Sequence, residues 1–543
     1  MKSFDYIIVG AGSAGCVVAN RLTADPSVSV CLIEAGGSDK SPWVTIPAGI
    51  FGLYGNKKYD YTFEGVPQKH LNNRTMMVNR GKALGGSSAI NSMVYIRGNR
   101  NDYDGWEKLG CAGWSYSDVL PVFKKLEANQ NGQSSNFHGS TGELSVTKPQ
   151  DPSPVGRIFV KAGQAAGLPE NTDFNADTQL GLGIYDVKQR RGKRESSYTA
   201  FVEPVLSRSN LTIMTHTEVV SLIIEGDRVT GLNAEVKGTP ETIQASKEVI
   251  LSAGTIVSPR ILLASGIGDR EQLKALGIEC HQHVPGVGEN LQDHVDSMVT
   301  VRSDKSDTIG ISAGTLLPHI LPAPFKYLFS RKGWWTTNYV EAGGFARTRL
   351  AEEAEPGSAD ADPDIQFHFT PLYRSHRGKK FEYGHGYSVF TCVLRPRSAG
   401  TVKLANDGTC RNVLIDHNFF ADKRDQELLV EGVKKAREIL ASSEFDHLRG
   451  EEMAPGKHIQ TDEEILEYLR DTTTTVYHPV GTCKMGVDEM AVVAPDTLKV
   501  KGMQNLRVMD ASVMPTLISG NTSAPSMMIG EKGAQMILDD MSS

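Results

Sequence analysis

The sequence has few cysteines and no two of them at close spacing. The seven cysteines are odd in number, lie far apart along the chain and include no Cys-x-x-Cys motif. This pattern argues against a zinc ribbon, a redox dithiol and a disulfide framework. It is typical of a protein kept in a reducing compartment.

Long apolar runs and blocks of basic residues are also missing. No uninterrupted run approaches the roughly 20 apolar residues that a membrane-spanning helix needs. The residues after Met1 show neither the basic nor the apolar region of a secretory signal, so we expect a cytoplasmic protein. The net charge is -7, and the sequence has no long run of Lys and Arg, so we expect no nucleic acid as a partner. His281 and His283 have metal-like spacing without a third ligand nearby, so we expect no metal site.

What the sequence does have is length and glycine. Its 543 residues exceed the usual size of one domain, and 54 of them are glycines. Hydrophobic residues make up 39% and charged residues 22% of the chain. These values fit an α/β protein of several domains with many tight turns.

A glycine turn near the N-terminus predicts a dinucleotide site. The motif Gly10-x-Gly12-x-x-Gly15 follows a predicted strand at residues 4–9 and precedes a helix at residues 16–22. The next strand ends at Glu34, whose carboxylate is placed to accept hydrogen bonds from ribose hydroxyls. The start of the helix offers free N–H groups to a diphosphate. The motif alone does not separate FAD from NAD.

A histidine near the C-terminus predicts the chemistry. His478 lies between Tyr477 and Pro479, where the following proline restricts its backbone. Asn521 follows downstream. An imidazole can accept the proton of an alcohol near neutral pH, and an amide can donate a hydrogen bond to the same oxygen. This pair therefore favours alcohol oxidation.

Two further segments make the chain resemble the glucose–methanol–choline (GMC) oxidoreductases, in their choline dehydrogenase-like and alcohol dehydrogenase branch. They are Gly81-Lys82-Ala83-Leu84-Gly85-Gly86-Ser87-Ser88-Ala89-Ile90-Asn91 and the run from Gly254-Thr255-Ile256-Val257-Ser258-Pro259 to Gly268. With the glycine turn and the His–Asn pair, the matches span nearly the whole chain in the family's order.

The resemblance implies an α/β fold with two interleaved domains. A Rossmann-type FAD-binding domain would comprise residues 1–155, 205–298 and 475–543. An α+β substrate-binding domain, built on an antiparallel sheet, would comprise residues 156–204 and 299–474.

The resemblance also implies which residues hold FAD. Some relatives attach FAD through a histidine at the place of Ile90, so we expect non-covalent FAD here. Ser13, Ala14 and Glu34 would hold the ADP part, with Val219 beside the adenine. The full expected set of cofactor-binding residues is Gly10, Gly12, Ser13, Ala14, Gly15, Glu34, Ala35, Gly86, Ser87, Asn91, Ser92, Val94, Val219, Ala253, Tyr477, Asp510 and Ala511.

By the same resemblance His478 is the catalytic base and Asn521 the second catalytic group. A primary alcohol would be oxidised to an aldehyde, or further to the acid, by hydride transfer to flavin N5. The electron acceptor would be O₂ or a quinone-type compound, and the protein a monomer or homodimer. Two alternatives stay open: a non-oxidative relative, either a hydroxynitrile lyase or a fatty-acid photodecarboxylase, and a redox-silent FAD-binding scaffold.

The middle of the chain predicts little about the substrate. Gln366 and His368 alternate as on one face of a strand and are candidates for the pocket. Choline-oxidising relatives use a glutamate near the place of Glu341, although a structural carboxylate at a strand end is the favoured interpretation. We interpret His138 as pinning a loop and His294 as structural.

Two segments of this middle region are predicted to lie at the surface. The apolar, proline-broken stretch at residues 316–325 favours a lid over a membrane-docking patch, so at most a peripheral membrane contact is expected. The acidic stretch at residues 351–364 is predicted to be an exposed loop.

Overall fold

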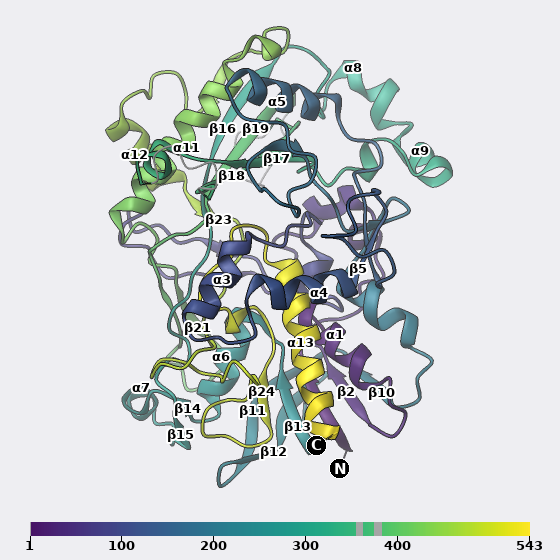
Figure 1. The fold of residues 1–543 in the computed structure, drawn as a ribbon, viewed down its shortest axis with the longest axis vertical. Coiled ribbons are helices and arrows are strands. Elements are labelled where there is room, and N and C mark those ends of the chain that lie inside the picture. The colour runs from purple at the N-terminus through teal and green to yellow at the C-terminus, as the bar shows by residue number, and fades with distance from the viewer. Residues whose placement is uncertain (1, 355–361, 374–382, 543) are drawn as a thin grey trace.

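Two seven-stranded sheets organise the molecule (Figure 1). The structure is a computed structural model, and it describes residues 2–354, 362–373 and 383–542. The first sheet lies in the lower half of Figure 1 and the second in the upper half.

The first sheet is parallel at its centre. Its order is β10-β2-β1-β13-β12-β11, and β24 also pairs with β13. β13 is long enough to pair with the antiparallel β12 along its first half and with the parallel β24 at its end. Its strands are β1 (Lys2–Val9), β2 (Val30–Ile33), β10 (Leu211–Met214), β11 (Thr217–Glu225), β12 (Arg228–Val236), β13 (Thr239–Leu251) and β24 (Leu506–Val508).

Helices cover the parallel strands, which explains why β1 and β2 end in continuous apolar runs. All four residues of β2 and the last four of β1 are buried. Helix α1 (Ser13–Leu22) packs against the C-terminal helix α13 (Ser523–Ser542), and Figure 1 shows the two side by side. Helix α6 (Gly254–Ala264) begins just after β13. The strand and helix predicted around the glycine turn are therefore confirmed.

The second sheet is antiparallel, in the order β22-β16-β19-β18-β17-β7 with β23 beside β16. Helices α5 (Pro154–Ala165) and α11 (Lys423–Leu440) pack together on one of its faces. Ile365, Phe367 and Phe369 belong to the core under these helices, so Gln366 and His368 take the opposite face. The strands are β7 (Gly181–Ile184), β16 (Val295–Ser303), β17 (Ala342–Ala346), β18 (Ile365–Thr370), β19 (His385–Val393), β22 (Glu452–Ala454) and β23 (Thr474–Thr475).

Smaller elements complete the fold. The remaining helices are α2 (Pro42–Thr45), α3 (Arg100–Lys108), α4 (Tyr116–Leu126), α7 (Arg270–Ala275), α8 (Ala313–Thr315), α9 (Ala323–Ser330), α10 (Arg349–Ala354) and α12 (Asp462–Thr472). Short strands pair as β3 (Phe63–Glu64) with β4 (Met77–Val78), β5 (Glu127–Asn129) with β6 (Leu144–Val146), β8 (Gln189–Arg190) with β9 (Lys193–Arg194), β14 (Ile267–Gly268) with β15 (Gln282–His283), and β20 (Thr401–Leu404) with β21 (Val413–Asp416).

The acidic stretch at residues 351–364 is not a loop throughout. Its first four residues end helix α10, so the prediction is wrong there. Residues 355–361 lie outside the described residues, and the prediction is not tested for them. Arg349 pairs with Glu353 one turn on, a spacing that supports exposed helices.

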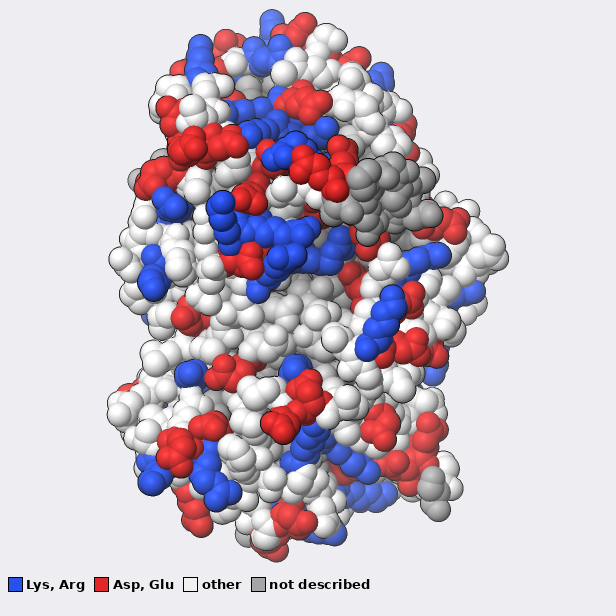
Figure 2. All heavy atoms as spheres, turned by 60° about the vertical axis from the view of Figure 1, so that its left-hand side comes forward, with Lys and Arg blue, Asp and Glu red and all other residues white. Residues whose placement is uncertain are grey.

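The surface carries charges of both signs. Figure 2 shows Lys and Arg side chains interspersed with Asp and Glu over the face turned to the viewer, with uncharged residues between them. Within the described ranges, no helix combines the length and the apolar composition needed to cross a bilayer. No cluster of three or more His, Cys, Asp or Glu side chains in this part of the chain is arranged to hold a metal ion.

Candidate active site

The carboxyl ends of the parallel strands open into one cavity with an empty volume of about 1480 Å³. Gly10 follows β1, Glu34 follows β2 and Ser252 follows β13, and all three line this cavity. Asp510, two residues beyond β24, lines it as well. Ligands of open α/β sheets bind at this edge of the sheet.

At Gly10 and Gly15 the glycine turn has closely packed neighbours that leave no room for a side chain. Gly10 has a φ of +104°, and a Cβ there would lie 2.4 Å from the carbonyl oxygen of Ser252. A Cβ on Gly15 would lie 2.0 Å from the carbonyl oxygen of Gly10. The first turn of α1 follows Gly12, which caps the helix with no side chain. Its N–H groups therefore stay available for an anion such as a diphosphate.

Glu34 stands at the same end of the cavity. Its carboxylate accepts hydrogen bonds from the backbone N–H of Ala11 (3.2 Å) and of Gly36 (2.8 Å). Burial raises the pKa of Glu34 to about 7, although the two N–H groups act in the opposite direction. A carboxylate oxygen can accept more than one hydrogen bond, so Glu34 retains capacity for ribose hydroxyls.

The second glycine segment lies directly on the first. The backbone N–H of Gly85 donates to the carbonyl of Ala11 at 2.8 Å, and a Cβ on Gly86 would lie 2.7 Å from the Cα of Gly12. Ser197 donates to the carbonyl of Gly12 at 3.1 Å. Gly12 and Gly86 thus share the wall of the cavity, and Ser197, which does not line it, supports Gly12.

At the other end of the cavity, strand pairing brings two histidines together. Val295 of β16 pairs with Thr475 of β23, which sets His294 beside the segment that carries His478. The Nδ1 atoms of the two rings lie 2.9 Å apart. His478 is also held by its backbone N–H, which donates to Asp293 at 2.8 Å.

The residue before His478 has a strained backbone. Tyr477 has a φ of +68°, a value that residues other than glycine seldom adopt. Its N–H donates to the hydroxyl of Thr475 at 2.7 Å, and its carbonyl accepts from Arg80 at 2.8 Å. These contacts and the restriction imposed by Pro479 hold the imidazole in place.

The hydrogen bonds determine the tautomer of His478. His294 Nε2 faces the carbonyl oxygen of Leu394 at 3.0 Å, and a carbonyl can only accept, so this nitrogen carries the proton. Burial lowers the pKa of His294 to about 4, which keeps the ring neutral and leaves Nδ1 as an acceptor. His478 must therefore donate from its own Nδ1. Its Nε2 then carries a free lone pair.

That lone pair faces Asn521. Nδ2 of Asn521 donates to Nε2 of His478 at 3.1 Å, and Oδ1 of Asn521 accepts from Gln366 at 3.3 Å. Burial lowers the pKa of His478 well below its usual range, and the neighbouring His294, His368 and Arg80 act in the same direction. The imidazole is a neutral base at physiological pH.

The structure brings the expected site residues together. Every one of them except Gly15 lines the cavity, including His478 and Asn521. Gly15 instead packs behind the turn, against Gly10. The sequence motifs did not point to Arg80, which also lines the cavity, or to the role of His294. His294 lies 184 residues from His478, so only its place in the segment Asn290-Leu291-Gln292-Asp293-His294 could have suggested a link.

The three residues considered for the substrate pocket, Gln366, His368 and Glu341, do not line the cavity. Gln366 nevertheless contacts Asn521. Nε2 of His368 is buried and has no hydrogen-bond partner among the described residues. Glu341 lies away from the cavity, and its carboxylate accepts from the backbone N–H of Ser153 at 2.6 Å. Burial raises the pKa of Glu341 to about 7.

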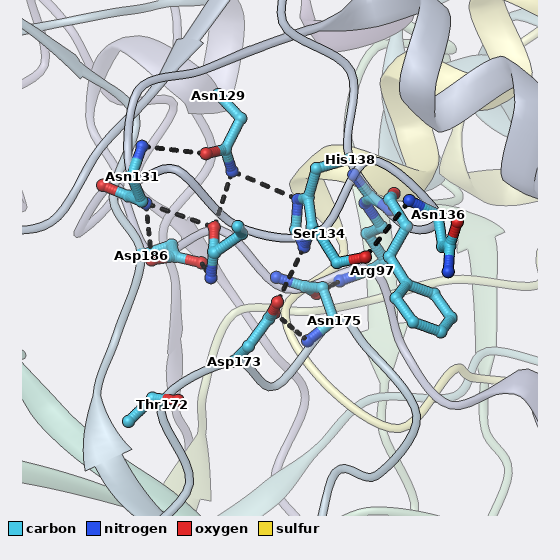
Figure 3. A network of polar contacts seen from close by, with 12 residues as sticks. Arg97, Asn129, Asn131, Ser134, Asn136, His138, Thr172, Asp173, Asn175 and Asp186 are labelled. Carbon is cyan, nitrogen blue, oxygen red and sulfur yellow. Dashed lines mark hydrogen bonds and ion pairs between the residues drawn. The ribbon is translucent and has the colours of Figure 1, made fainter.

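His138 lies in a separate polar network, where it pins a loop as expected (Figure 3). Its Nδ1 contacts Glu127 at 3.0 Å and its Nε2 contacts Asp173 at 3.0 Å. Burial alone would lower the pKa of His138, but the hydrogen bonds to Asp173 and Glu127 outweigh it and raise the pKa to about 9. Arg97 pairs with the same fully buried Glu127.

Comparison with known proteins agrees with this architecture. The family models for the N-terminal and C-terminal parts of GMC oxidoreductases match residues 4–296 and 396–530. The chain belongs to the GMC oxidoreductase family. The family and fold expected from the four motifs are thus confirmed, and the protein is an oxidoreductase.

Relatives of this GMC oxidoreductase match over almost their whole length. An alcohol dehydrogenase (acceptor) of Pseudomonas putida is 42% identical over 98% of this chain and 96% of the relative. An oxygen-dependent choline dehydrogenase of Staphylococcus saprophyticus is 39% identical over 99% and 95%. A solved structure of formate oxidase from Aspergillus oryzae RIB40, studied for modification of its FAD, matches with a TM-score of 0.91 and 27% identity, covering 100% of this chain and 99% of that one.

Proposed function

We propose that this GMC oxidoreductase uses FAD to oxidise a primary alcohol to an aldehyde, with His478 as the base. The observation that carries the proposal is the acceptor atom Nε2 of His478, which meets the amide Nδ2 of Asn521 at 3.1 Å where both residues line the cavity. The relatives named alcohol dehydrogenase and choline dehydrogenase support the same reaction class.

His478 and Asn521 have different roles toward the alcohol. A hydroxyl group that approaches both residues displaces the hydrogen bond between them, donates to His478 Nε2 and accepts from Asn521 Nδ2. His478 takes the hydroxyl proton, and Asn521 stabilises the oxygen as it becomes negative. The chemistry that FAD supplies when bound is acceptance of a hydride from the alcohol carbon at N5. The hydrogen bond from His478 to His294 keeps the accepting nitrogen directed at the alcohol during the proton transfer.

The expected FAD-binding residues support a cofactor laid along the cavity. Its diphosphate would lie on the first turn of α1, and Glu34 would accept from the adenosine ribose. The place that would carry a covalent histidine is the buried Ile90, whose side chain has no nucleophilic atom. We therefore propose non-covalent FAD.

An uncharged alcohol fits the reacting end better than choline. Arg80 puts a positive charge on the cavity wall next to Tyr477 and His478. In the described part of the chain, the acids that line the cavity are Glu34, Glu218 and Asp510, which all lie by the first sheet. The carboxylate of Glu341 is already bound to Ser153. A quaternary ammonium group would thus meet Arg80 with no acid in the neighbouring cavity wall to pair with it.

Anaerobic reduction of the enzyme-bound flavin by a panel of alcohols tests the proposal. We expect primary aliphatic and aromatic alcohols to bleach the flavin, and choline to do so more slowly. His478→Ala should slow the bleaching by about 10²–10⁴-fold, the usual value of a general base. His281→Ala, which removes an exposed histidine, is the matched control and should leave the rate unchanged.

Other outcomes of this experiment decide between the alternatives. If no alcohol bleaches the flavin and the protein instead converts a cyanohydrin or, under light, a fatty acid, it is a non-oxidative relative. No reaction with any of these would indicate a redox-silent scaffold. Admitting air to the reduced enzyme then separates O₂ from a quinone-type acceptor, because only an oxidase recovers its colour quickly.

A further inference from the structure

Helices α8 and α9, with the π-helical turn Leu316–Ile320 between them, expose an apolar surface on the half of the molecule that holds the second sheet. Figure 1 shows both helices at the outer edge of the upper half. Phe329 is 86% exposed and Leu317 is 75% exposed. We call this the 316–329 surface, and its large exposed apolar residues are Leu316, Leu317, Leu321, Phe325, Leu328 and Phe329.

The 316–329 surface is not arranged as a lid over the cavity. None of its six apolar residues lines the cavity, and all of them point to solvent. The segment is fastened by its other side, where Ala323 and Tyr327 are buried and the ring of His319 stacks on Trp334 at 4.6 Å. Six large apolar side chains within one short segment exceed the scattered exposure that is normal on a soluble surface.

The charge within the segment that forms this surface is one-sided, although Asp151 accepts from the neighbouring backbone N–H of Gly333 at 2.9 Å. Between Thr308 and Trp335 the sequence has no Asp or Glu, whereas Lys326, Arg331 and Lys332 are cationic. The whole chain, in contrast, has a net charge of -7. None of these three cations forms a salt bridge with a residue in the described ranges.

We propose that the 316–329 surface docks this protein onto an anionic lipid bilayer. Phe and Leu side chains on a short helix can enter the boundary between headgroups and acyl chains, while nearby lysine and arginine bind anionic headgroups. The absence of acids from this segment matches a negatively charged lipid surface.

The docking surface is connected to the cavity wall by a short segment. The carbonyl of Thr336 accepts from Gln189 at 3.2 Å, and Asn338 donates to the carbonyl of Ser92 at 2.7 Å. Ser92 lines the cavity. The 316–329 surface is therefore linked to the cavity wall through a few residues. Docking itself does not depend on the proposed reaction.

Flotation of the FAD-loaded protein with lipid vesicles tests the proposal. We expect it to float with vesicles of equal parts phosphatidylglycerol and phosphatidylcholine, to bind pure phosphatidylcholine more weakly, and to lose the difference in high salt because salt screens charge. The double variant Phe325→Ser/Phe329→Ser should lower the vesicle partition coefficient about tenfold or more, because each buried ring contributes strongly to transfer. Lys326→Glu/Lys332→Glu should weaken binding to the anionic vesicles only.

Leu414→Ser is the matched control, since Leu414 is an exposed apolar residue of β21 outside this surface and its loss should not change flotation. Unchanged flavin absorbance and turnover of a water-soluble alcohol show that the variants are folded. The proposal is overturned if the wild type does not float with anionic vesicles, or if the Phe double variant floats equally well. It is also overturned if the surface instead mediates a dimer in lipid-free sedimentation, one that the double variant dissociates, without vesicle binding.

Discussion

The imidazole of His478 is held by partners at both of its nitrogens. Nδ1 donates to His294, which is itself held by the carbonyl of Leu394, and Nε2 meets the amide of Asn521. The chain of contacts continues from Asn521 to Gln366 on β18. The carbonyl of Leu394 can only accept and both rings are neutral, so one arrangement of protons satisfies the whole chain. His294 is therefore a positioning residue for the base.

Replacing His294 tests this role. In His294→Phe, Nδ1 of His478 loses its buried acceptor and the ring is free to adopt the unproductive tautomer. We expect kcat to fall about 10- to 100-fold with KM nearly unchanged, the cost of an unsatisfied buried donor. His294→Asn, whose carbonyl can accept from Nδ1, should recover part of the loss. Steady-state kinetics of the FAD-loaded variants measure both.

The pH profile of the wild type tests the lowered pKa of His478. Because burial lowers the pKa of His478, the wild type should keep its kcat/KM on the acid side of pH 6.5, the usual value for histidine. The protonated base would be inactive, so the acid limb should lie below that pH. If His294→Phe instead lost FAD and thermal stability while the remaining loaded enzyme kept its kcat, the positioning role would be wrong.

Elements meet at the glycine turn, where helix α1 and strand β1 approach too closely for side chains. We predict that Gly15→Ala weakens FAD binding and lowers the melting temperature, since its Cβ would lie 2.0 Å from the carbonyl oxygen of Gly10. Gly105→Ala on α3 is the control, because no atom lies within 4 Å of the new Cβ. That change should be neutral or stabilise by up to about 1 kcal/mol. Calorimetry and FAD titration compare the two variants.

The elements around β5 are tied by His138, and this contact should make stability depend on pH. The pKa of His138 is about 9 in the folded protein and 6.5 in its ordinary state. A raised pKa means that the stabilisation is complete below about pH 6.5 and is lost as pH rises through about 9. His138→Gln should thus lower the free energy of unfolding by on the order of 2 kcal/mol at pH 6 and by much less at pH 9.5. Urea denaturation at the two pH values measures this, and an equal loss at both would contradict the charged contact.

At the scale of the whole molecule, the cavity is assembled from segments that are far apart in sequence. Residues near positions 10, 34, 87, 219, 253, 478 and 510 share its wall. A ligand that fills it should therefore stabilise the entire fold. The division into an FAD-binding and a substrate-binding domain at the predicted boundaries stays a prediction, as do the cytoplasmic location and the oligomeric state.

Added FAD should raise the stability of the FAD-depleted protein by about 2.7 kcal/mol at a free concentration of 100 Kd, whereas NAD should not. Thermal unfolding at increasing FAD concentration measures the effect.

If FAD is held without a covalent bond, acid precipitation should leave a colourless pellet and a yellow supernatant. A pellet that stayed yellow would overturn the non-covalent proposal at Ile90.

Local patterns were enough to predict the strand–turn–helix around Gly10 and the strand that carries Gln366 and His368, whereas the catalytic roles of His478 and Asn521 came from the resemblance to the GMC oxidoreductases. The local patterns depend on residue spacing and backbone preference, which are properties of a few neighbouring residues. The contact of His294 with His478, the withdrawal of Glu341 from the cavity and the outward face of residues 316–329 depend on how distant strands and helices pack. Only the tertiary structure decided these, because burial and hydrogen-bond partners are set by neighbours in space.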